Sequence, residues 1–233
     1  RTDNFGVLIH DPDTDVILLY LESFGNPRRF SRLARRIGRR KPIIAVKSGR
    51  TAAGARAASS HTGSLASLDV AVDALFHQAG VIRTDTLGDL FDVASLLANQ
   101  PVPEGRRVAL VTNAGGPAIL AVDALESNGL TVPELSLELQ RKLRDHLSPE
   151  AAVRNPIDMI AAAGPEQYRA CLAELFTSDE VDAVIAIYIP TSPDGSLDTA
   201  NAIHDVGVEY HGEKTFLSVY MSSEGAPAPL SST

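Results

Sequence analysis

Two continuous apolar segments with a helical pattern between them constrain the fold of this chain more than any other feature. The segments are Val16–Leu21 and Lys41–Val46. Such near-continuous apolar character is typical of strands that are buried on both faces of a parallel sheet. Between them, residues 27–40 repeat apolar side chains at helical spacing and carry arginines on the opposite face. The pattern predicts a strand–helix–strand unit.

The same alternation continues along the chain and predicts an α/β protein. Alternating strands and helices with short connections favour parallel sheets covered by helices, so we expect two open, doubly wound domains. The further helices are expected at residues 68–79, ended by Gly80, and at 87–98, 117–127, 138–147 and 165–176; the further strands are expected at 108–111, 184–189 and 215–220.

Residues 99–105 interrupt every periodic pattern, and their two prolines and one glycine make this segment the predicted linker. We therefore expect one domain at residues 1–100 and a second at residues 106–233. The segment Ala-Pro-Ala-Pro at residues 226–229 is expected to form a mobile tail.

The composition excludes several classes of protein. Hydrophobic residues at 44% and charged residues at 21% match globular proteins, which argues against disorder. Aromatic residues reach only 5%, and 21 basic against 29 acidic residues give a net charge of −8, so nucleic-acid binding is not expected. No apolar run is long enough to cross a membrane, and the histidines lack metal-ligand spacing, so neither a membrane span nor a metal site is expected.

A single cysteine cannot form an internal disulfide, which favours a reducing cytoplasm. Cys171 shares a helical face with Tyr168, Leu172 and Leu175. That arrangement favours core packing over a reactive thiol.

One histidine lies among small residues, in the segment Ser60-His61-Thr62-Gly63. Few bulky neighbours surround it in sequence, so another molecule can reach its ring, and Gly63 allows a backbone to approach closely. His61 is therefore a candidate nucleophile or proton carrier, the alternative being an exposed loop histidine with no role. A nucleophilic imidazole must be neutral, with one ring nitrogen donating to an acceptor and the other free to attack. A carboxylate partner is expected.

Glu22 is the candidate partner because it directly follows the strand Val16–Leu21. Ligands and catalytic groups gather at the carboxyl ends of strands in open parallel sheets. The alternative is an ordinary charged residue where a strand leaves the core.

A second candidate site is the turn of residues 111–117, Val-Thr-Asn-Ala-Gly-Gly-Pro, where a strand passes through glycines into a helix expected to begin at Pro117. The free backbone donors and the positive dipole end of that helix suit a phosphate; a glycine turn with only a geometric role is the alternative. The segment Asn155-Pro156-Ile157-Asp158 joins a proline turn to a carboxylate at another strand end, where a functional role and ordinary capping are both open.

Two basic segments carry weaker signals. Residues 49–54 have the glycine spacing of a P-loop, but Ala55-Arg56 replaces the required Lys-Ser/Thr pair, so the nucleotide-binding signature fails. Lys47, Arg50 and Arg56 still make this loop locally positive. The arginines between residues 28 and 40 form either a solvated helix face or a docking surface.

Together these segments resemble the NDP-forming acyl-CoA synthetases, relatives of succinyl-CoA synthetase, across nearly the whole chain. The resemblance implies two flavodoxin-like domains, the first of which starts late, without the upstream strand and glycine-serine turn of the family. The segments that carry it are Tyr20–Glu22, Lys47–Arg50, Ser60–Leu65, Gln78–Arg83, Val111–Pro117 and Asn155–Asp158.

The resemblance also implies roles. In that family the histidine matching His61 takes a phosphoryl group from ATP and passes it between the nucleotide and a carboxylate substrate, through an acyl phosphate that CoA then attacks. Glu22 would orient this histidine. The residues implied to bind the phosphate are Asn113, Ala114, Gly115 and Gly116, and those implied to support the site are Ser60, Thr62, Gly63, Asn155 and Asp158.

By the same resemblance, the complete enzyme uses CoA and ATP or ADP with Mg²⁺, none of them expected tightly bound to this chain. The expected partners are a CoA-binding Rossmann domain and an ATP-grasp domain, in the same polypeptide or a partner subunit, and an oligomer is expected. The chain alone is not expected to complete turnover. The same core also occurs fused to protein-lysine acetyltransferases, so a non-catalytic, acyl-CoA-sensing module is the alternative.

Overall fold

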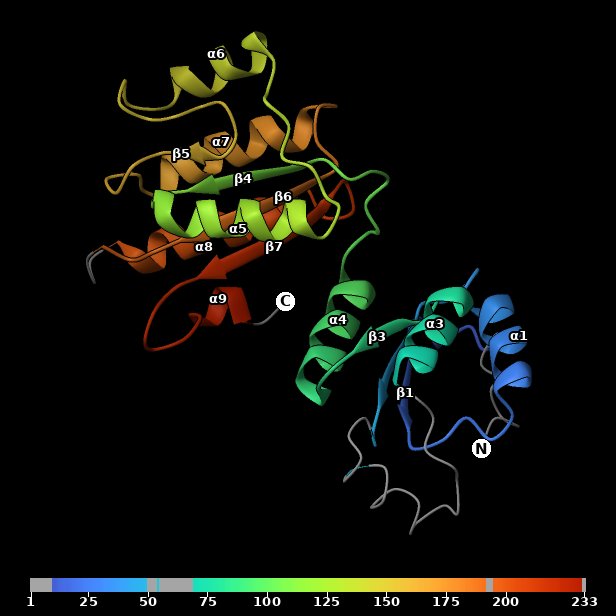
Figure 1. Cartoon of the computed structure of the whole chain (residues 1–233). Helices are drawn as coiled ribbons and strands as arrows, with labels where there is room; N and C mark the ends of the chain where they lie inside the picture. The colour runs from blue at the N-terminus through green and yellow to red at the C-terminus, as the bar shows by residue number, and fades with distance from the viewer. Residues whose placement is uncertain (1–9, 50–53, 55–68, 192–194, 232–233) are drawn as a thin grey trace. The chain divides into compact units, whose positions relative to one another are not determined.

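The chain divides into two compact α/β units, Arg1–Asn99 and Gln100–Thr233. The computed structural model describes residues 10–49, 54, 69–191 and 195–231. Each unit has its own parallel sheet, and Figure 1 shows the helices that cover each of them. The predicted α/β class with two parallel, flavodoxin-like sheets is confirmed.

The first unit is built on a three-stranded parallel sheet in the order β1 (Ile17–Leu21), β2 (Ile43–Lys47) and β3 (Ile82–Thr84). Side chains of β1 and β2 that point to one face pack with α1 (Pro27–Ile37) and α3 (Asp69–Ala79). On the other face, Ile44 and Val46 of β2 pack with α4 (Leu87–Asn99). Because β2 is covered on both faces, all of its residues are buried, as its apolar run predicts.

Helix α1 forms where the sequence predicts it, and its amino acids explain both ends. The Asn26 side chain accepts a hydrogen bond from the Arg29 amide at 3.0 Å, and Pro27 occupies the first turn, where a missing N–H costs nothing. Phe30, Ala34 and Ile37 are buried, while the arginines face outward. Burial of a side chain such as Phe30 stabilises the fold by about 1.5–3 kcal/mol relative to leaving it in water.

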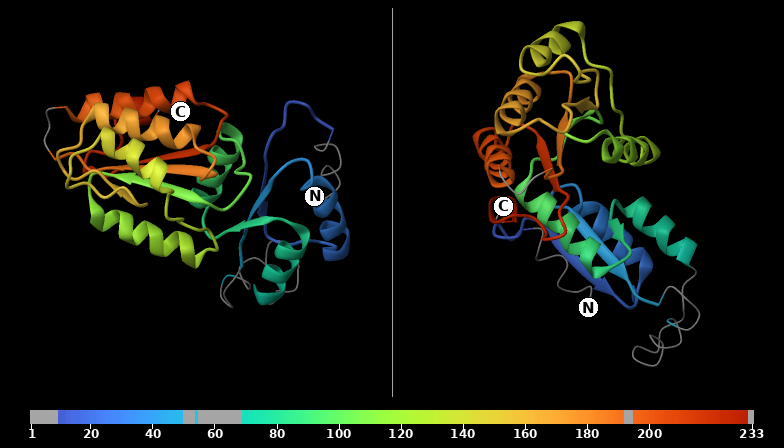
Figure 2. Two further views of the ribbon diagram at one scale, coloured as in Figure 1. Left: turned by 90° about the horizontal axis from the view of Figure 1, so that it is seen from above. Right: turned by 90° about the vertical axis from the view of Figure 1, so that its left-hand side faces the viewer.

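The second unit has a four-stranded parallel sheet in the order β5 (Ile157–Asp158), β4 (Val108–Thr112), β6 (Ala183–Tyr188) and β7 (Thr215–Tyr220). One face carries the larger core, which is formed with helices α6 (Leu137–Asp145), α7 (Pro165–Thr177) and α8 (Ser196–Glu209). Helix α5 (Gly115–Ser127) covers the opposite face, as the left view of Figure 2 shows.

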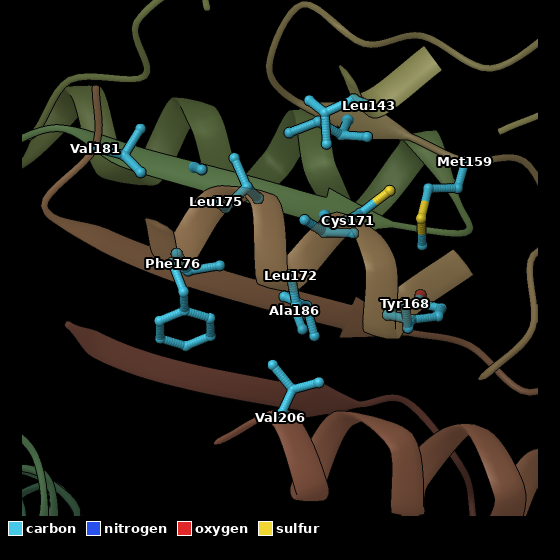
Figure 3. Close-up of a cluster of buried hydrophobic side chains, with 14 of the residues drawn as sticks. Leu143, Met159, Tyr168, Cys171, Leu172, Leu175, Phe176, Val181, Ala186 and Val206 are labelled. Atoms are coloured by element: carbon cyan, nitrogen blue, oxygen red, sulfur yellow. The ribbon is translucent and has the colours of Figure 1, made fainter. Parts of the chain in front are cut away.

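Cys171 lies in this core, as predicted. Cys171, Tyr168, Leu172 and Leu175 of α7 are all fully buried, and Figure 3 shows them pointing into one cluster with Val206 of α8. Burial, with a smaller effect of Glu174, raises the pKa of the Cys171 thiol to about 12. A thiol that stays protonated and buried is a packing group and not a nucleophile.

Several predicted boundaries were wrong. Helix α5 begins at Gly115, two residues before Pro117, because the glycines already adopt helical backbone conformations. The segment predicted to be a mobile tail contains a short helix, α9 (Ala228–Ser231), whose Leu230 packs against the core. Strands β3 and β5 and helix α8 were not predicted: the two strands are only three and two residues long, and α8 buries small residues that give little periodic contrast.

The predicted linker begins as part of the second unit. The Gln100 side-chain oxygen accepts a hydrogen bond from the Phe216 amide at 3.0 Å, and the Pro101 carbonyl accepts one from the Thr215 hydroxyl at 2.5 Å. These bonds attach residues 100 and 101 to the start of β7. None of the described helices is long and apolar enough to span a bilayer.

Candidate active site

In the first unit, the candidate residues lie where the parallel strands end. Glu22 directly follows β1 and is partly buried, as predicted from the sequence. Lys47, the last residue of β2, pairs in register with Leu21, so it lies one residue from Glu22 on the neighbouring strand. The Ser48 amide donates to the Leu21 carbonyl at 3.0 Å, which holds the two strand ends together. This carboxyl edge is where ligands bind in open parallel sheets.

The charges at this edge interact with one another. Burial, followed by the nearby Arg83 guanidinium, lowers the pKa of Lys47, while the carboxylates of Asp69 and Glu22 oppose that shift. Arg83 bonds to both Asp69 and Asp73 of α3, with the Asp69 contact at 2.5 Å. The described part of this edge therefore holds the cationic side chains of Lys47 and Arg83 together with several acidic ones, among them Asp85, which directly follows β3.

The histidine loop lies outside the described residues. Ser60, His61, Thr62 and Gly63, together with Arg50 and Arg56 of the positive loop, belong to segments 50–53 and 55–68. Their predicted roles stay predictions.

In the second unit, the predicted phosphate turn is fixed by a buried asparagine. Asn113 is only 2% exposed, and its side chain forms two bonds with the backbone of Ile189, after β6. The Asn113 amide donates to the Ile189 carbonyl at 2.8 Å, and its oxygen accepts from the Ile189 N–H at 2.9 Å. The Tyr168 hydroxyl donates to the Ile187 carbonyl at 2.7 Å and lies 3.4 Å from the Asn113 oxygen. Because its amide oxygen and one of its two amide hydrogens bond to the Ile189 backbone, Asn113 positions the turn.

The turn itself leads into an uncapped helix end. The Thr112 hydroxyl accepts from the Ala114 amide at 2.9 Å and donates to the Ala114 carbonyl at 3.0 Å, which shapes the turn. Ala114 is the N-cap residue of α5 and provides no side-chain cap. The amides of Gly115 and Gly116 begin the helix and have no carbonyl within it to bond to. Together with the helix dipole, they form an end that attracts anions.

Asp158 lies against this helix end. A Cβ atom at position 115 would lie 2.7 Å from the Asp158 Oδ2 atom, so only glycine fits there without a shift. The other carboxylate oxygen of Asp158 accepts from the Ile160 amide at 3.0 Å, which restricts how far the side chain can turn away. Asp158 thus lies beside the predicted phosphate-binding residues.

Asn155 has a structural task at the edge of the sheet. Its oxygen accepts from the Leu110 amide at 3.0 Å, and its nitrogen donates to the carbonyls of Val108 and Pro133 at 2.9 and 3.0 Å. The side chain therefore completes the hydrogen bonding of β4 before β5 begins at Ile157. It supports the turn by holding β4 in place and not by facing it.

Sequence reasoning missed two residues of these edges. Thr112 shapes the turn through its hydroxyl, and a threonine just before an Asn-Ala-Gly-Gly run is a signal for such a bond. Lys47 was named in the positive loop and in a segment that carries the resemblance but was given no role, although it is a lysine at the end of an otherwise apolar strand. Among the described residues, no group of three histidine, cysteine or acidic side chains is arranged to hold a metal ion.

The comparisons with known proteins identify both units. Residues 2–97 match the succinyl-CoA ligase-like flavodoxin domain, and residues 108–212 match the ligase-CoA domain. The chain belongs to the ADP-forming acyl-CoA synthetase family.

Relatives in this family match most of the chain but are longer. The alpha subunit of ADP-forming acetate–CoA ligase II of Pyrococcus furiosus is 38% identical over 88% of this chain and 45% of its own length. ADP-forming 4-hydroxybutyrate–CoA ligase of Nitrosopumilus maritimus is 33% identical over 95% of the chain and 32% of its own length. The chain thus spans less than half of these relatives.

A solved member of the family has the same fold. Dinucleotide-forming acetyl-coenzyme A synthetase 1 of Candidatus Korarchaeum cryptofilum, in complex with phosphate and ADP, matches with a TM-score of 0.90 and 32% identity. The match covers 98% of this chain and 50% of the solved chain.

Proposed function

We propose that this chain forms the phosphoryl-transfer core of an ADP-forming acyl-CoA synthetase, which joins a small carboxylic acid to CoA at the expense of a nucleoside triphosphate. The observation that carries the proposal is the uncapped, glycine-headed end of α5 within a ligase-CoA domain. Such an end binds the phosphoryl group that these reactions transfer. The family relatives, which are CoA ligases by name, favour this function over the acetyltransferase-fused sensory module.

The first unit contributes the phosphate carrier. His61 accepts the phosphoryl group on one ring nitrogen while the other ring nitrogen donates to the Glu22 carboxylate. This contact keeps the neutral imidazole in one tautomer before the transfer and stabilises the cationic ring after it. Ser60, Thr62 and Gly63 give the loop small side chains that leave the ring accessible.

The second unit contributes an anion-binding turn. The amides of Gly115 and Gly116 donate to the phosphate oxygens. Ala114, the N-cap residue, positions the backbone so that these amides point toward the phosphate. Asn113 and Asn155 hold the turn in place through their backbone bonds. Since these donors are set by folding, they need no rearrangement when negative charge arrives.

The remaining chemistry belongs to other domains. CoA and the nucleotide with Mg²⁺ supply the thiol and the phosphoryl donor, and we assign their binding to a CoA-binding domain and an ATP-grasp domain in the same polypeptide or in a partner subunit of a cytoplasmic, oligomeric enzyme. This chain's residues accept, hold and release the phosphoryl group. It is inactive without those domains.

The test is phosphorylation of His61 in the complete enzyme. With ATP and magnesium, mass spectrometry or radiolabelling under alkaline conditions should detect an acid-labile phosphate on His61, and His61→Asn should abolish it. Glu22→Gln should slow labelling without unfolding the protein, because an amide stabilises the cationic ring less than a carboxylate does. Equal labelling of wild type and His61→Asn would contradict the proposal.

A further inference from the structure

Lys47 is a lysine in an unusual place. It ends β2 on the same face as Ile43 and Ala45, which pack beneath α1 and α3. The residue is only 9% exposed, although lysine is among the side chains least often buried. Lys47 is therefore a largely buried lysine at the carboxyl edge of the sheet.

The ammonium group is not neutralised by a neighbour. It donates one hydrogen bond, to the carbonyl of the adjacent Ser48. Within residues 10–49 and the later described segments, it forms no ion pair, and Glu22 and Asp69 act on it only at longer range. A buried charge without a partner opposes folding unless something compensates it.

Arg83 explains why the nearby carboxylates do not compensate Lys47. Arg83 pairs in register with Ala45, so its side chain lies on the same face of the sheet. Its two terminal nitrogens bond to Asp69 and Asp73, the two acidic residues that α3 brings closest to this edge. The Arg83 Nε atom is buried and has no hydrogen-bond acceptor in the part of the chain that the structure describes. Two cationic side chains with unused donors thus lie next to each other.

This arrangement suits an oxyanion and not a cation or an apolar ligand. An ammonium group with two hydrogens that bond to no described residue, together with a guanidinium Nε–H, can bind several oxygens of one tetrahedral anion at once. Besides Asp69 and Asp73, the described acidic residues at this edge are Glu22, on the neighbouring strand, and Asp85, which directly follows β3. An incoming dianion would neutralise Lys47, which forms no ion pair with any described residue.

We propose that Lys47 is a phosphate-binding residue of the first unit, which holds the oxygens of the transferred phosphoryl group with Arg83 Nε as a second donor. The inference rests on the proposed function, because it assigns the ligand of that same site. It places a side-chain anion receptor in the first unit, in addition to the backbone receptor of α5 in the second.

The test is a titration of the chain with inorganic phosphate, followed by NMR at the backbone amides of Leu21, Ser48 and Thr84. These amides report on the first unit, so binding at α5 does not interfere. Lys47→Gln should weaken phosphate binding at this site at least about tenfold, since a charge-assisted hydrogen bond is lost. Lys41→Gln is the matched control, because Lys41 precedes the same strand at the opposite edge and bonds to the Asp11 carbonyl; it should bind as wild type does.

Two further arms make the result decisive. Glu22→Gln should tighten phosphate binding a few-fold, because it removes a negative charge beside the anion. Acetate, a small carboxylate of the class that the proposed reaction uses, should shift these amide signals only weakly.

Wild-type affinity for phosphate in a folded Lys47→Gln variant, or Lys47-dependent binding of acetate but not phosphate, would overturn the assignment. Circular dichroism establishes that the variant is folded, and Lys47→Arg, which keeps the charge, should restore part of the affinity.

The complete enzyme separates this inference from the proposed function. If His61 is phosphorylated normally in Lys47→Gln, the role of Lys47 is wrong and the proposed function stands. If wild type never labels His61 but phosphate binding depends on Lys47, the proposed function is wrong and the anion site stands.

Discussion

The carboxyl edges of the two sheets are built from different kinds of group. In the second unit, a neutral side chain holds the edge: Asn113 bonds to the partly buried backbone of Ile189, and the Asp158 carboxylate beside Gly115 accepts from a backbone amide. In the first unit, the edge carries charges, with Glu22 and Lys47 on neighbouring strands. A neutral edge is set once, by folding. A charged edge changes with pH and with the ligands that it binds, so the two units should respond differently to substitution.

The largest effect is expected from removing Asn113. Asn113→Ala removes a buried side chain and leaves the partly buried N–H and carbonyl of Ile189 without these partners, and each costs about 1–3 kcal/mol where water does not replace the bond. We therefore expect the free energy of unfolding of the second unit to fall by about 2–5 kcal/mol, measured by urea denaturation.

Asn128→Ala is the matched control for this prediction. Asn128 also donates its side-chain amide to a carbonyl, that of Ala124 at 2.8 Å, but in an exposed position where water replaces the lost bond. Its cost should be under about 1 kcal/mol. Similar losses in the two variants would show that the neutral edge does not depend on the buried pair.

A moderate effect is expected at the start of α5. Gly115→Ala places a methyl group 2.7 Å from the Asp158 carboxylate and should cost about 1–2 kcal/mol, because the carboxylate or the helix end must move. Gly116→Ala has no atom within 4 Å of the new methyl group and should be neutral or slightly stabilising.

A double-mutant cycle sharpens this prediction. In an Asp158→Ala background the contact is gone, so Gly115→Ala should lose most of its cost. An unchanged cost in that background would mean that the glycine is needed for its backbone and not for the close approach of Asp158.

The fold was predictable from sequence wherever local patterns are long. Strands β2, β4 and β6 are continuous apolar runs, and α1 has a clear apolar stripe with an Asn-Pro start. The short strands β3 and β5 carry too few residues for any period to be read. They exist because the neighbouring long strand offers hydrogen bonds, which is a tertiary effect.

Some site residues could likewise be predicted from local sequence, and others could not. The glycine turn and the strand-end position of Glu22 follow from local sequence. The partner of Asn113 lies 76 residues away, so no local pattern indicates that its side chain is committed to Ile189. The burial of Lys47 likewise depends on α3 and β3, which join β2 only after folding.

The smallest effect expected is a pH dependence confined to the charged edge. The folded pKa of Lys47 lies below its ordinary value, because burial and Arg83 disfavour the charge more than Glu22 and Asp69 favour it. Between the lowered pKa and the ordinary one, the unfolded chain binds more protons, so the stability of the first unit should rise as pH rises. Lys47→Gln should lack this rise.

Lys214 tests whether the effect belongs to the first unit, since burial also lowers the pKa of this second-unit lysine. The contribution of Lys214 to the pH dependence of stability should be the same in wild type and in Lys47→Gln. It therefore cancels when the free energy of unfolding of one protein is subtracted from that of the other at each alkaline pH. Phosphate should flatten the remaining difference, because a bound anion favours the charged form of Lys47 and raises its pKa. If the difference in stability between wild type and Lys47→Gln does not vary with pH, folding does not lower the pKa of Lys47. The two edges would then differ in which residues they contain but not in how their stability depends on pH.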